Sequence, residues 1–367
     1  MIEIDFVTQR DSLSPDERRD YLIDLFEQNV PIDCKELTIL TFYSMDRVIS
    51  EIDLQILLGR LTQLEKFIII GKETNYLTNM EFLGTIDTLK IVDVRKINKD
   101  LNFISSLNQI EVLSIPPSAD NLIPPELSGL TELKELNISE NVNFSDEQYS
   151  FFKDLVNLRK LTIKSKNLNL KKLVTDSELS NLEHLNVSES NVQNMELDLS
   201  TSTRLKVLRM NKVKNFKNLI LPTQIEEIYA EKTNNFIEVF LEDKEYPELK
   251  VLNIPEGKHN IKLKIDTTED KTHFKTSFYK KQVNNLNPDI VDGGLSTFFF
   301  FDIKASKLKN INMAKSKFKH DEGLPGQPHH FIRYFSLDIS KYSNLEECNL
   351  TSFYGAEPIL SIMNDKL

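Results

Sequence analysis

Residues that could perform chemistry are sparse in this 367-residue chain. The densest group of potential metal ligands is His329 and His330, with His320, Asp321 and Glu322 a few residues upstream. They fall in a segment rich in Pro and Gly, where solvated loop histidines are far more common than a metal site. The sequence contains no nucleotide-binding glycine loop, serine-nucleophile elbow, paired-cysteine motif or zinc-protease helix. It therefore predicts no metal ion, no cofactor, no small-molecule substrate and no enzymatic activity.

Cysteine usage and hydropathy predict a protein of a reducing compartment. Cys34 and Cys348 are the only cysteines and lie near opposite ends of the chain, so they cannot form a disulfide framework. The first residues lack the basic and apolar regions of a secretory signal, and no stretch reaches the ~20 apolar residues of a membrane helix. We therefore expect an intracellular protein, cytoplasmic or nuclear, that does not span a membrane.

The formal net charge is −11, which disfavours nucleic acid as a partner, because that association depends on Lys and Arg neutralising phosphates. The charge is nevertheless unevenly distributed. Residues 159–217 contain 12 Lys and Arg against 6 Asp and Glu, and residues 258–320 contain 13 against 6. An anionic ligand or a nucleic acid bound to these basic stretches therefore stays open as an alternative.

A six-residue pattern of apolar residues, here called the hexad, recurs along the chain. It indicates the strands that must position any functional residue. Apolar residues occupy its first, fourth and sixth positions, and successive hexads begin 20 to 25 residues apart. Because the fourth and sixth positions are two apart, both side chains leave the same face of a strand and point inward. The nine hexads in phase are Leu64/Phe67/Ile69, Leu89/Val92/Val94, Ile110/Leu113/Ile115, Leu133/Leu136/Ile138, Leu158/Leu161/Ile163, Leu182/Leu185/Val187, Leu205/Leu208/Met210, Ile225/Ile228/Ala230 and Leu249/Leu252/Ile254.

This frame resembles the leucine-rich-repeat superfamily, whose repeats are 20 to 29 residues long. Residues 123–141 are similar to a nearly ideal repeat, including the terminal asparagine that most other units lack. The resemblance implies an α/β fold, a leucine-rich-repeat solenoid shaped as a curved horseshoe. Parallel strands would line its concave face, and helices, 3-10 turns and loops would return over its convex face.

Two returns can be predicted from their own residues. Ser145 and Gln148 have capping-box spacing, and apolar residues follow at three-residue steps, which predicts a helical return. The step from Leu205 to Ile225 is only 20 residues, which leaves room for an irregular or 3-10 return.

We divide the chain into four segments. Residues 1–32 are expected to hold an N-terminal capping helix over 15–28, since Ser14-Pro15-Asp16-Glu17 is a strong helix start. Residues 33–265 hold the leucine-rich repeats, with a first strand at Cys34/Leu37/Ile39. Residues 266–300 are expected to be an irregular insertion that ends in a degenerate strand near Phe298. Residues 301–367 are expected to hold degenerate C-terminal repeats, with hexads starting at Leu308 and Leu345, and a cap.

Partner-binding residues are expected on the outward side of the strands. The residue between the two inward strand positions, and the residue after the hexad, form two columns on the concave face. Because arginine and aromatic residues are common interface anchors, Arg209 and Tyr229 are expected at the centre, near Lys164 and Lys212. The candidate partner-binding residues are Asp93, Asn137, Lys164, Asn186, Arg209, Lys212, Tyr229 and Glu231.

These inferences favour a non-catalytic intracellular adaptor that binds a protein with an acidic or mixed-charge surface. The irregular, Lys- and Asn-rich repeats also resemble fungal leucine-rich-repeat proteins of the F-box type, which implies a substrate receptor of a ubiquitin ligase. An F-box needs several helices before the repeats, however, and only the helix over 15–28 precedes the strand at Cys34. A bacterial effector or surface protein is a third alternative.

Overall fold

The computed structural model describes residues 1–5, 14–41, 50–71, 79–95, 101–175, 179, 181–192, 196–214, 218–234, 244–261, 297–301, 303–320, 332–337, 342–350 and 357–360. The chain forms two compact units, Met1–Asn215 and Phe216–Leu367, here called unit 1 and unit 2.

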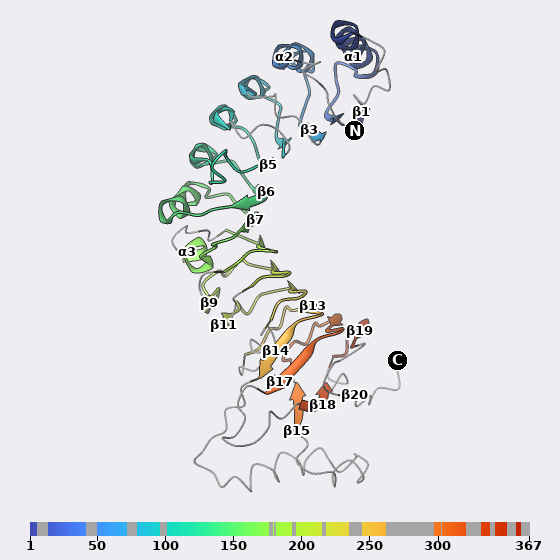
Figure 1. Ribbon diagram of the computed structural model, residues 1–367. Coiled ribbons are helices and arrows are strands. Elements are labelled where there is room, and N and C mark those ends of the chain that lie inside the picture. The colour runs from blue at the N-terminus through green and yellow to red at the C-terminus, as the bar shows by residue number, and fades with distance from the viewer. Residues whose placement is uncertain are drawn as a thin grey trace. The chain divides into compact units, whose positions relative to one another are not determined.

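Unit 1 is built on a sheet whose strands lie in the order of the chain, with β10 next to β8 (Figure 1). Its strand pairs are parallel. The strands are β1 (Ile2–Asp5), β2 (Glu36–Thr41), β3 (Lys66–Gly71), β4 (Ile91–Asp93), β5 (Val112–Ile115), β6 (Glu135–Val142), β7 (Lys160–Ser165), β8 (His184–Asn186) and β10 (Val207–Arg209).

Burial of the apolar frame produces this sheet. Every inward residue of the nine hexads is at most 4% exposed. Equivalent inward residues are paired across neighbouring strands, as in Val92 with Leu113 and Leu113 with Leu136. Burying one such side chain contributes roughly 1.5–3 kcal/mol, so the stacked triplets form a continuous core. The prediction of stacked parallel strands is confirmed.

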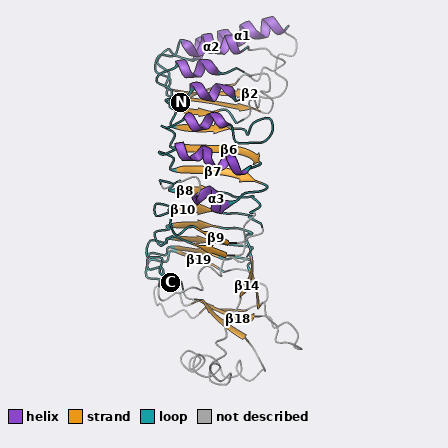
Figure 2. Cartoon of the chain, turned by 90° about the vertical axis from the view of Figure 1, so that its left-hand side faces the viewer, coloured by secondary structure: helices purple, strands orange, loops and turns teal. Residues whose placement is uncertain are grey.

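Helical returns cover the other side of the sheet in unit 1 (Figure 2). They are α1 (Pro15–Asn29), α2 (Glu51–Gly59), η1 (Glu81–Thr85), η2 (Asn102–Ser106), η3 (Pro125–Gly129), η4 (Asp146–Asp154) and α3 (Leu170–Thr175). The elements labelled η are 3-10 helices. The expected mixture of helix, 3-10 and loop returns is therefore observed.

The helical return predicted after Ser145 is η4, a 3-10 helix. Its capping box is present, with the Ser145 amide donating to Gln148 Oε1 at 2.9 Å. Tyr149, Phe152 and Leu155 are all buried. Because a 3-10 helix has three residues per turn, their three-residue spacing places them on one face.

The return between Leu205 and Ile225 differs from the prediction. It contains β11 (Asn218–Ile220), a short strand, where an irregular or 3-10 segment was expected. A similar strand, β9 (Glu196–Asp198), lies in the preceding return. An extended chain rises about 3.3 Å per residue, against about 2.0 Å in a 3-10 helix, so it crosses the repeat with fewer residues.

Unit 2 repeats the frame in a parallel sheet of β12 (Glu227–Tyr229), β13 (Val251–Asn253), β16 (Asn310–Asn312) and β19 (Glu347–Asn349). The last two are the strands expected at Leu308 and Leu345. The strand expected near Phe298 is β15 (Thr297–Phe301), but it lies in a separate sheet with β18 (Ile332–Leu337) and β20 (Glu357–Leu360). A further pair joins β14 (Lys258–Ile261) to β17 (Lys317–His320). Most of the expected insertion, residues 266–296, lies outside the described residues.

Small hydroxyl residues replace the terminal asparagine of several repeats. Ser190, Thr233 and Ser316 each follow the last inward residue by three positions and are fully buried. Ser316 Oγ donates to the Ile254 carbonyl at 3.1 Å, and Ser190 Oγ accepts from the Ser165 amide at 3.0 Å. Because the Ser190 and Ser316 hydroxyls already connect neighbouring repeats, the asparagine is dispensable at those two positions.

An ion pair joins α1 to α2. Arg19 Nε donates to Asp53 Oδ2 at 3.0 Å, and Arg19 Nη2 contacts the other carboxylate oxygen. The Asp53 side chain is 2% exposed and completes a capping box with Ser50 at the start of α2. Burial raises the pKa of Asp53, but the hydrogen bonds from Arg19 and Ser50 outweigh burial and hold the pKa below its ordinary value.

Replacing Asp53 with Ala should lower the free energy of unfolding by about 2 kcal/mol, because it removes a helix cap and leaves Arg19 without its partner. We place the value below that of a fully buried pair because the Arg19 side chain is 44% exposed. Since the pKa of Asp53 is lowered on folding, its contribution is present above the ordinary value of 3.8 and is lost as the pH falls below it. Urea unfolding measures the effect. Asp24→Ala, on the exposed side of α1, is the control, and equal losses in both variants would contradict the assignment.

Candidate functional site

A row of polar side chains crosses consecutive strands of unit 1. Asn137 of β6 is paired with Thr162 of β7, Thr162 with Asn186 of β8, and Asn186 with Arg209 of β10. These residues lie between buried inward positions, so their side chains leave the opposite face of the sheet. Arg209 is exposed and the other three are partly exposed. We call Asn137, Thr162, Asn186 and Arg209 the polar row.

Asp93 extends this row toward the N-terminus but already has a partner. It lies on β4, paired with Ser114 of β5. Arg95 Nε and Nη2 each donate to one Asp93 carboxylate oxygen at 2.8 Å. The hydrogen bond and the charge of Asp93 raise the pKa of Arg95 despite its burial. Asp93 and Arg95 therefore present a neutralised pair on the sheet face.

A tight turn follows the inward residues of β8. The Ser190 amide donates to the Val187 carbonyl at 3.2 Å, and Glu189 between them has a φ of 63°. Side chains other than glycine and asparagine seldom adopt this left-handed conformation. Two bonds hold the turn: the Glu189 amide donates to the Asn211 carbonyl of the next repeat at 2.7 Å, and Asn186 Oδ1 accepts from the Ser188 amide at 3.1 Å.

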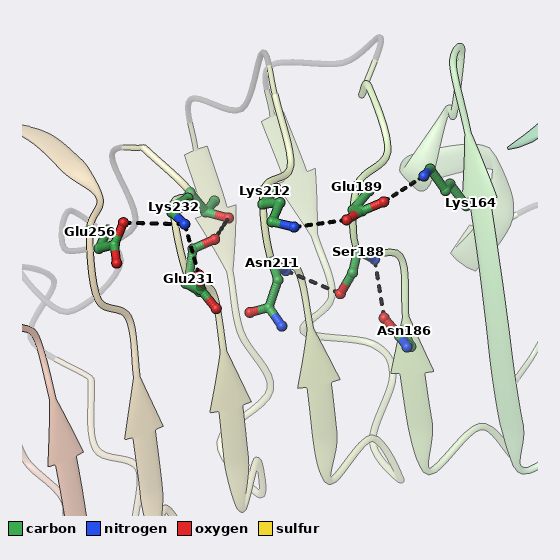
Figure 3. A network of polar contacts seen from close by, with 10 residues as sticks. Lys164, Asn186, Ser188, Glu189, Asn211, Lys212, Glu231, Lys232 and Glu256 are labelled. Carbon is green, nitrogen blue, oxygen red and sulfur yellow. Dashed lines mark hydrogen bonds and ion pairs between the residues drawn. The ribbon is translucent and has the colours of Figure 1, made fainter.

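Glu189 brings two predicted site residues together (Figure 3). Lys164 donates to one of its carboxylate oxygens, and Lys212 Nζ donates to the other at 2.9 Å. Lys164 and Lys212 come from the repeats on either side. Their hydrogen bonds and positive charges lower the pKa of Glu189 from 4.5 to about 2. Sequence reasoning selected both lysines but missed the carboxylate between them.

Unit 2 contains the remaining two predicted residues, Tyr229 and Glu231. The Tyr229 hydroxyl donates to Glu227 Oε2 on the same strand at 3.0 Å. Lys232 lies 3.3 Å from a carboxylate oxygen of Glu231 and 3.3 Å from one of Glu256 (Figure 3). Lys232 and Glu256 also have left-handed backbones, with φ of 56° and 59°. Turns of this kind therefore carry paired charges in both units.

A column of charged side chains, which sequence reasoning missed, lies at the start of the strands in unit 1. It consists of the residue that directly follows the first apolar residue of each repeat, and its sign alternates almost without exception. Its members are Lys35, Glu65, Lys90, Glu111, Lys134, Arg159, Glu183 and Lys206. We call these residues the charge column.

Neighbours in the charge column form ion pairs. Lys35 Nζ lies 2.9 Å from Glu65 Oε1, Lys134 Nζ lies 2.5 Å from Glu111 Oε2, and Arg159 Nη1 lies 3.8 Å from Glu183 Oε1. In the sequence, the signal is the alternation of sign at this one position of the frame. It was missed because only the positions between and after the inward residues were considered.

The described residues show no arrangement suited to catalysis by metal ions. Among them, no group of three or more His, Cys, Asp or Glu could hold a metal. His329 and His330 lie outside the described residues. Burial raises the pKa of both Cys34 and Cys348, which disfavours the reactive thiolate. No helix in the described part of the chain has the length and apolar character to cross a membrane.

Glu189 should titrate far below an ordinary glutamate. We expect a side-chain carboxyl pKa of about 2, measurable by carbon-detected NMR. Replacing Lys164 and Lys212 with Ala should return it toward 4.5. Because folding lowers this pKa, the stability from Glu189 is present above 4.5 and is lost as the pH falls toward 2. Identical titration in the wild type and the double variant would refute the bridging role.

Reversing one member of the charge column should destabilise unit 1. Glu111→Lys would place four positive side chains in succession, and we expect the free energy of unfolding to fall by about 1 kcal/mol. The loss should shrink in 1 M NaCl, because exposed charges are screened there. Glu147→Lys, on the exposed side of η4, supplies a control with the same change of net charge. Urea melts that show equal losses for both variants would argue against the column.

No protein-family model and no curated protein matches this chain. Among solved structures, a leucine-rich-repeat protein of Leptospira interrogans is 14% identical over 82% of this chain and 76% of that chain, with a TM-score of 0.45. A TDR receptor is 12% identical over 97% of this chain and 62% of that chain, with a TM-score of 0.46.

The Arabidopsis receptor kinase HAESA, solved with the peptide hormone IDA and the co-receptor SERK1, is 12% identical over 89% of this chain and 50% of that chain, with a TM-score of 0.40. The three TM-scores lie below 0.5, so the assignment depends on the repeats and strand registers of this chain. Those repeats and registers show the fold of a leucine-rich-repeat solenoid, with parallel strands stacked in repeat order.

Proposed function

We propose that the chain is a non-catalytic adaptor that binds a partner protein on the sheet face of unit 1. The observation that carries this proposal is the polar row, in which four outward side chains sit on four consecutive paired strands. Strands about 4.8 Å apart hold the row over roughly 15 Å, enough to meet a folded surface or an extended peptide. Because each strand is fixed by a buried core, a partner would meet side chains that are already ordered.

Arg209 is the anchor of the proposed interface. It is the exposed member of the polar row, and arginine is among the residues that most often dominate binding energy. The neighbouring group of Lys164, Glu189 and Lys212 has one more positive than negative charge. A partner with an acidic or mixed-charge surface therefore fits this face best. In unit 2, Tyr229 and Glu231 are candidate contacts considered separately.

The alternative of an anionic-ligand or nucleic-acid binder gains less support. In the stretch 159–217, Arg159, Lys164 and Lys212 all pair with glutamates. In the stretch 258–320, Lys307 pairs with Glu248 at 2.7 Å. Phosphate contacts would have to break such pairs. The F-box alternative also gains no support. Along the chain, α1 follows β1 and precedes β2, and these two strands are paired in the repeat sheet, so α1 is part of the repeat array.

The test compares what the full chain captures before and after a change confined to the polar row. Thr162→Arg with Arg209→Glu alters the face, and Lys153→Glu on η4 alters the covered side. A true partner should be enriched by the wild type and by Lys153→Glu, and lost about 30-fold with the double variant, since an anchor arginine contributes roughly 2 kcal/mol. Melting temperatures must agree among the three proteins. A partner that survives the double variant but is lost with Lys153→Glu would move the interface to the other side.

A further inference from the structure

Two isoleucines on α2 are exposed to solvent. Ile52 is 67% exposed and Ile56 is 61% exposed, and they lie four residues apart on one face of the helix. Among the described helices, no other presents a large apolar side chain to solvent. Fully burying one isoleucine would contribute roughly 1.5–3 kcal/mol, and most of that contribution is absent while these side chains face water.

The exposed isoleucines border a seam between α1 and α2. Arg19 and Glu27 of α1 lie eight residues apart on one face. Arg19 forms an ion pair with Asp53 of α2, and Glu27 forms one with Arg60, the residue that directly follows α2. Ile23 lies midway between Arg19 and Glu27, so it belongs to the same face. The ion pairs therefore join the two helices at both ends of the seam and leave apolar residues between them.

On α2, Ile56 lies on the face that borders this seam. This residue lies three positions after Asp53 and four before Arg60, which places it on the side of the helix that meets α1. Ile52, four residues earlier, extends the apolar strip toward the start of α2. We call Ile23, Ile52 and Ile56 the cap strip.

Acidic side chains border the cap strip on α1. Asp16, Asp20 and Asp24 are exposed and follow one another at four-residue steps. Like charges at this spacing destabilise a helix by about 0.2–0.5 kcal/mol per pair, so the row opposes folding of the helix that carries it. Glu51 adds a further carboxylate at the start of α2. Asp20 also lies 3.6 Å from Arg19 Nη1, which already pairs with Asp53, so the rim keeps an excess of negative charge beside the apolar residues.

We propose that the cap strip is a second docking surface, which takes a basic amphipathic helix of another protein. Two apolar side chains of that helix, three or four residues apart, would cover Ile52 and Ile56, as in other helix-in-groove complexes. Its lysines or arginines would lie over the row of Asp16, Asp20 and Asp24. This surface is separate from the polar row, so it goes beyond the adaptor function proposed above and gives the chain two attachment points.

The experiment selects the partner chemistry without assuming a natural partner. A phage library displays a helical scaffold randomised on one face, and it is selected on the full wild-type chain after depletion on the Ile52→Gln, Ile56→Gln double variant. We expect enriched helices to carry two apolar residues three or four apart, flanked by Lys or Arg. Enrichment of acidic or non-amphipathic sequences, or no clone that distinguishes the two proteins, would overturn the proposal.

A synthetic peptide of the enriched sequence then gives the affinities by fluorescence anisotropy. The Ile52→Gln, Ile56→Gln variant should bind it about tenfold or more weakly. Asp20→Asn with Asp24→Asn should weaken it about fivefold at low salt. Val156→Gln, at an apolar residue that is 59% exposed elsewhere in unit 1, should leave binding unchanged. Equal losses in the Val156 and isoleucine variants would refute the assigned location.

A second copy of this chain is the other occupant to test. Sedimentation velocity of the wild type should show a monomer at the concentrations used for binding. A dimer that dissociates in the Ile52→Gln, Ile56→Gln variant would assign the cap strip to self-association and overturn the proposal for a foreign helix. Because the polar row is unchanged in these variants, the outcome is independent of the test of the adaptor function.

Discussion

The structure depends on one constraint: an inward triplet of apolar side chains can leave water only against the triplets of the repeats beside it. A single repeat has no core of its own, so its strand, turn and return are stable only within the stack. In unit 1, the inward residues of the strands, from Phe67 of β3 to Leu208 of β10, are nearly inaccessible to solvent. The apolar frame is nevertheless almost the same in every repeat, so it does not by itself specify which repeats are neighbours. The turns and the charge column add that information, because their bonds join particular pairs.

The strands were predictable because a two-residue spacing of inward positions, repeated in phase, has few other physical solutions. The same reasoning failed where that period is short or absent. β1 offers only Ile2 and Ile4 before its strand ends. In α2 both the buried Leu57 and the exposed Ile56 are apolar, so the sequence does not show which face is covered. β15 was expected as a strand, but the sequence does not reveal that it joins a sheet of its own.

The candidate site was predictable only in part, since its geometry depends on contacts between repeats. Position in the frame suffices to place Asn186 and Arg209 on the outward side of the sheet. It does not show that Lys164 and Lys212 share Glu189, because the three residues are far apart in sequence and meet through a left-handed turn. Polar groups that satisfy one another are less available to a partner. In the described part of unit 1, the two surfaces that we propose for partners are the polar row on the sheet face and the cap strip on the N-terminal helices.

Alternation of sign along the charge column also bears on how such an array can change its length. Each positive member has a negative neighbour on at least one side, and the only like-charged neighbours in the column are Lys134 and Arg159. Loss or duplication of a single repeat would bring two like charges together at most positions, whereas loss or duplication of two adjacent repeats would preserve the order of signs. The charge column therefore favours gain or loss of an even number of repeats, which adds no contact between like charges. Gain or loss of an odd number of repeats adds such a contact at most positions and is unfavourable.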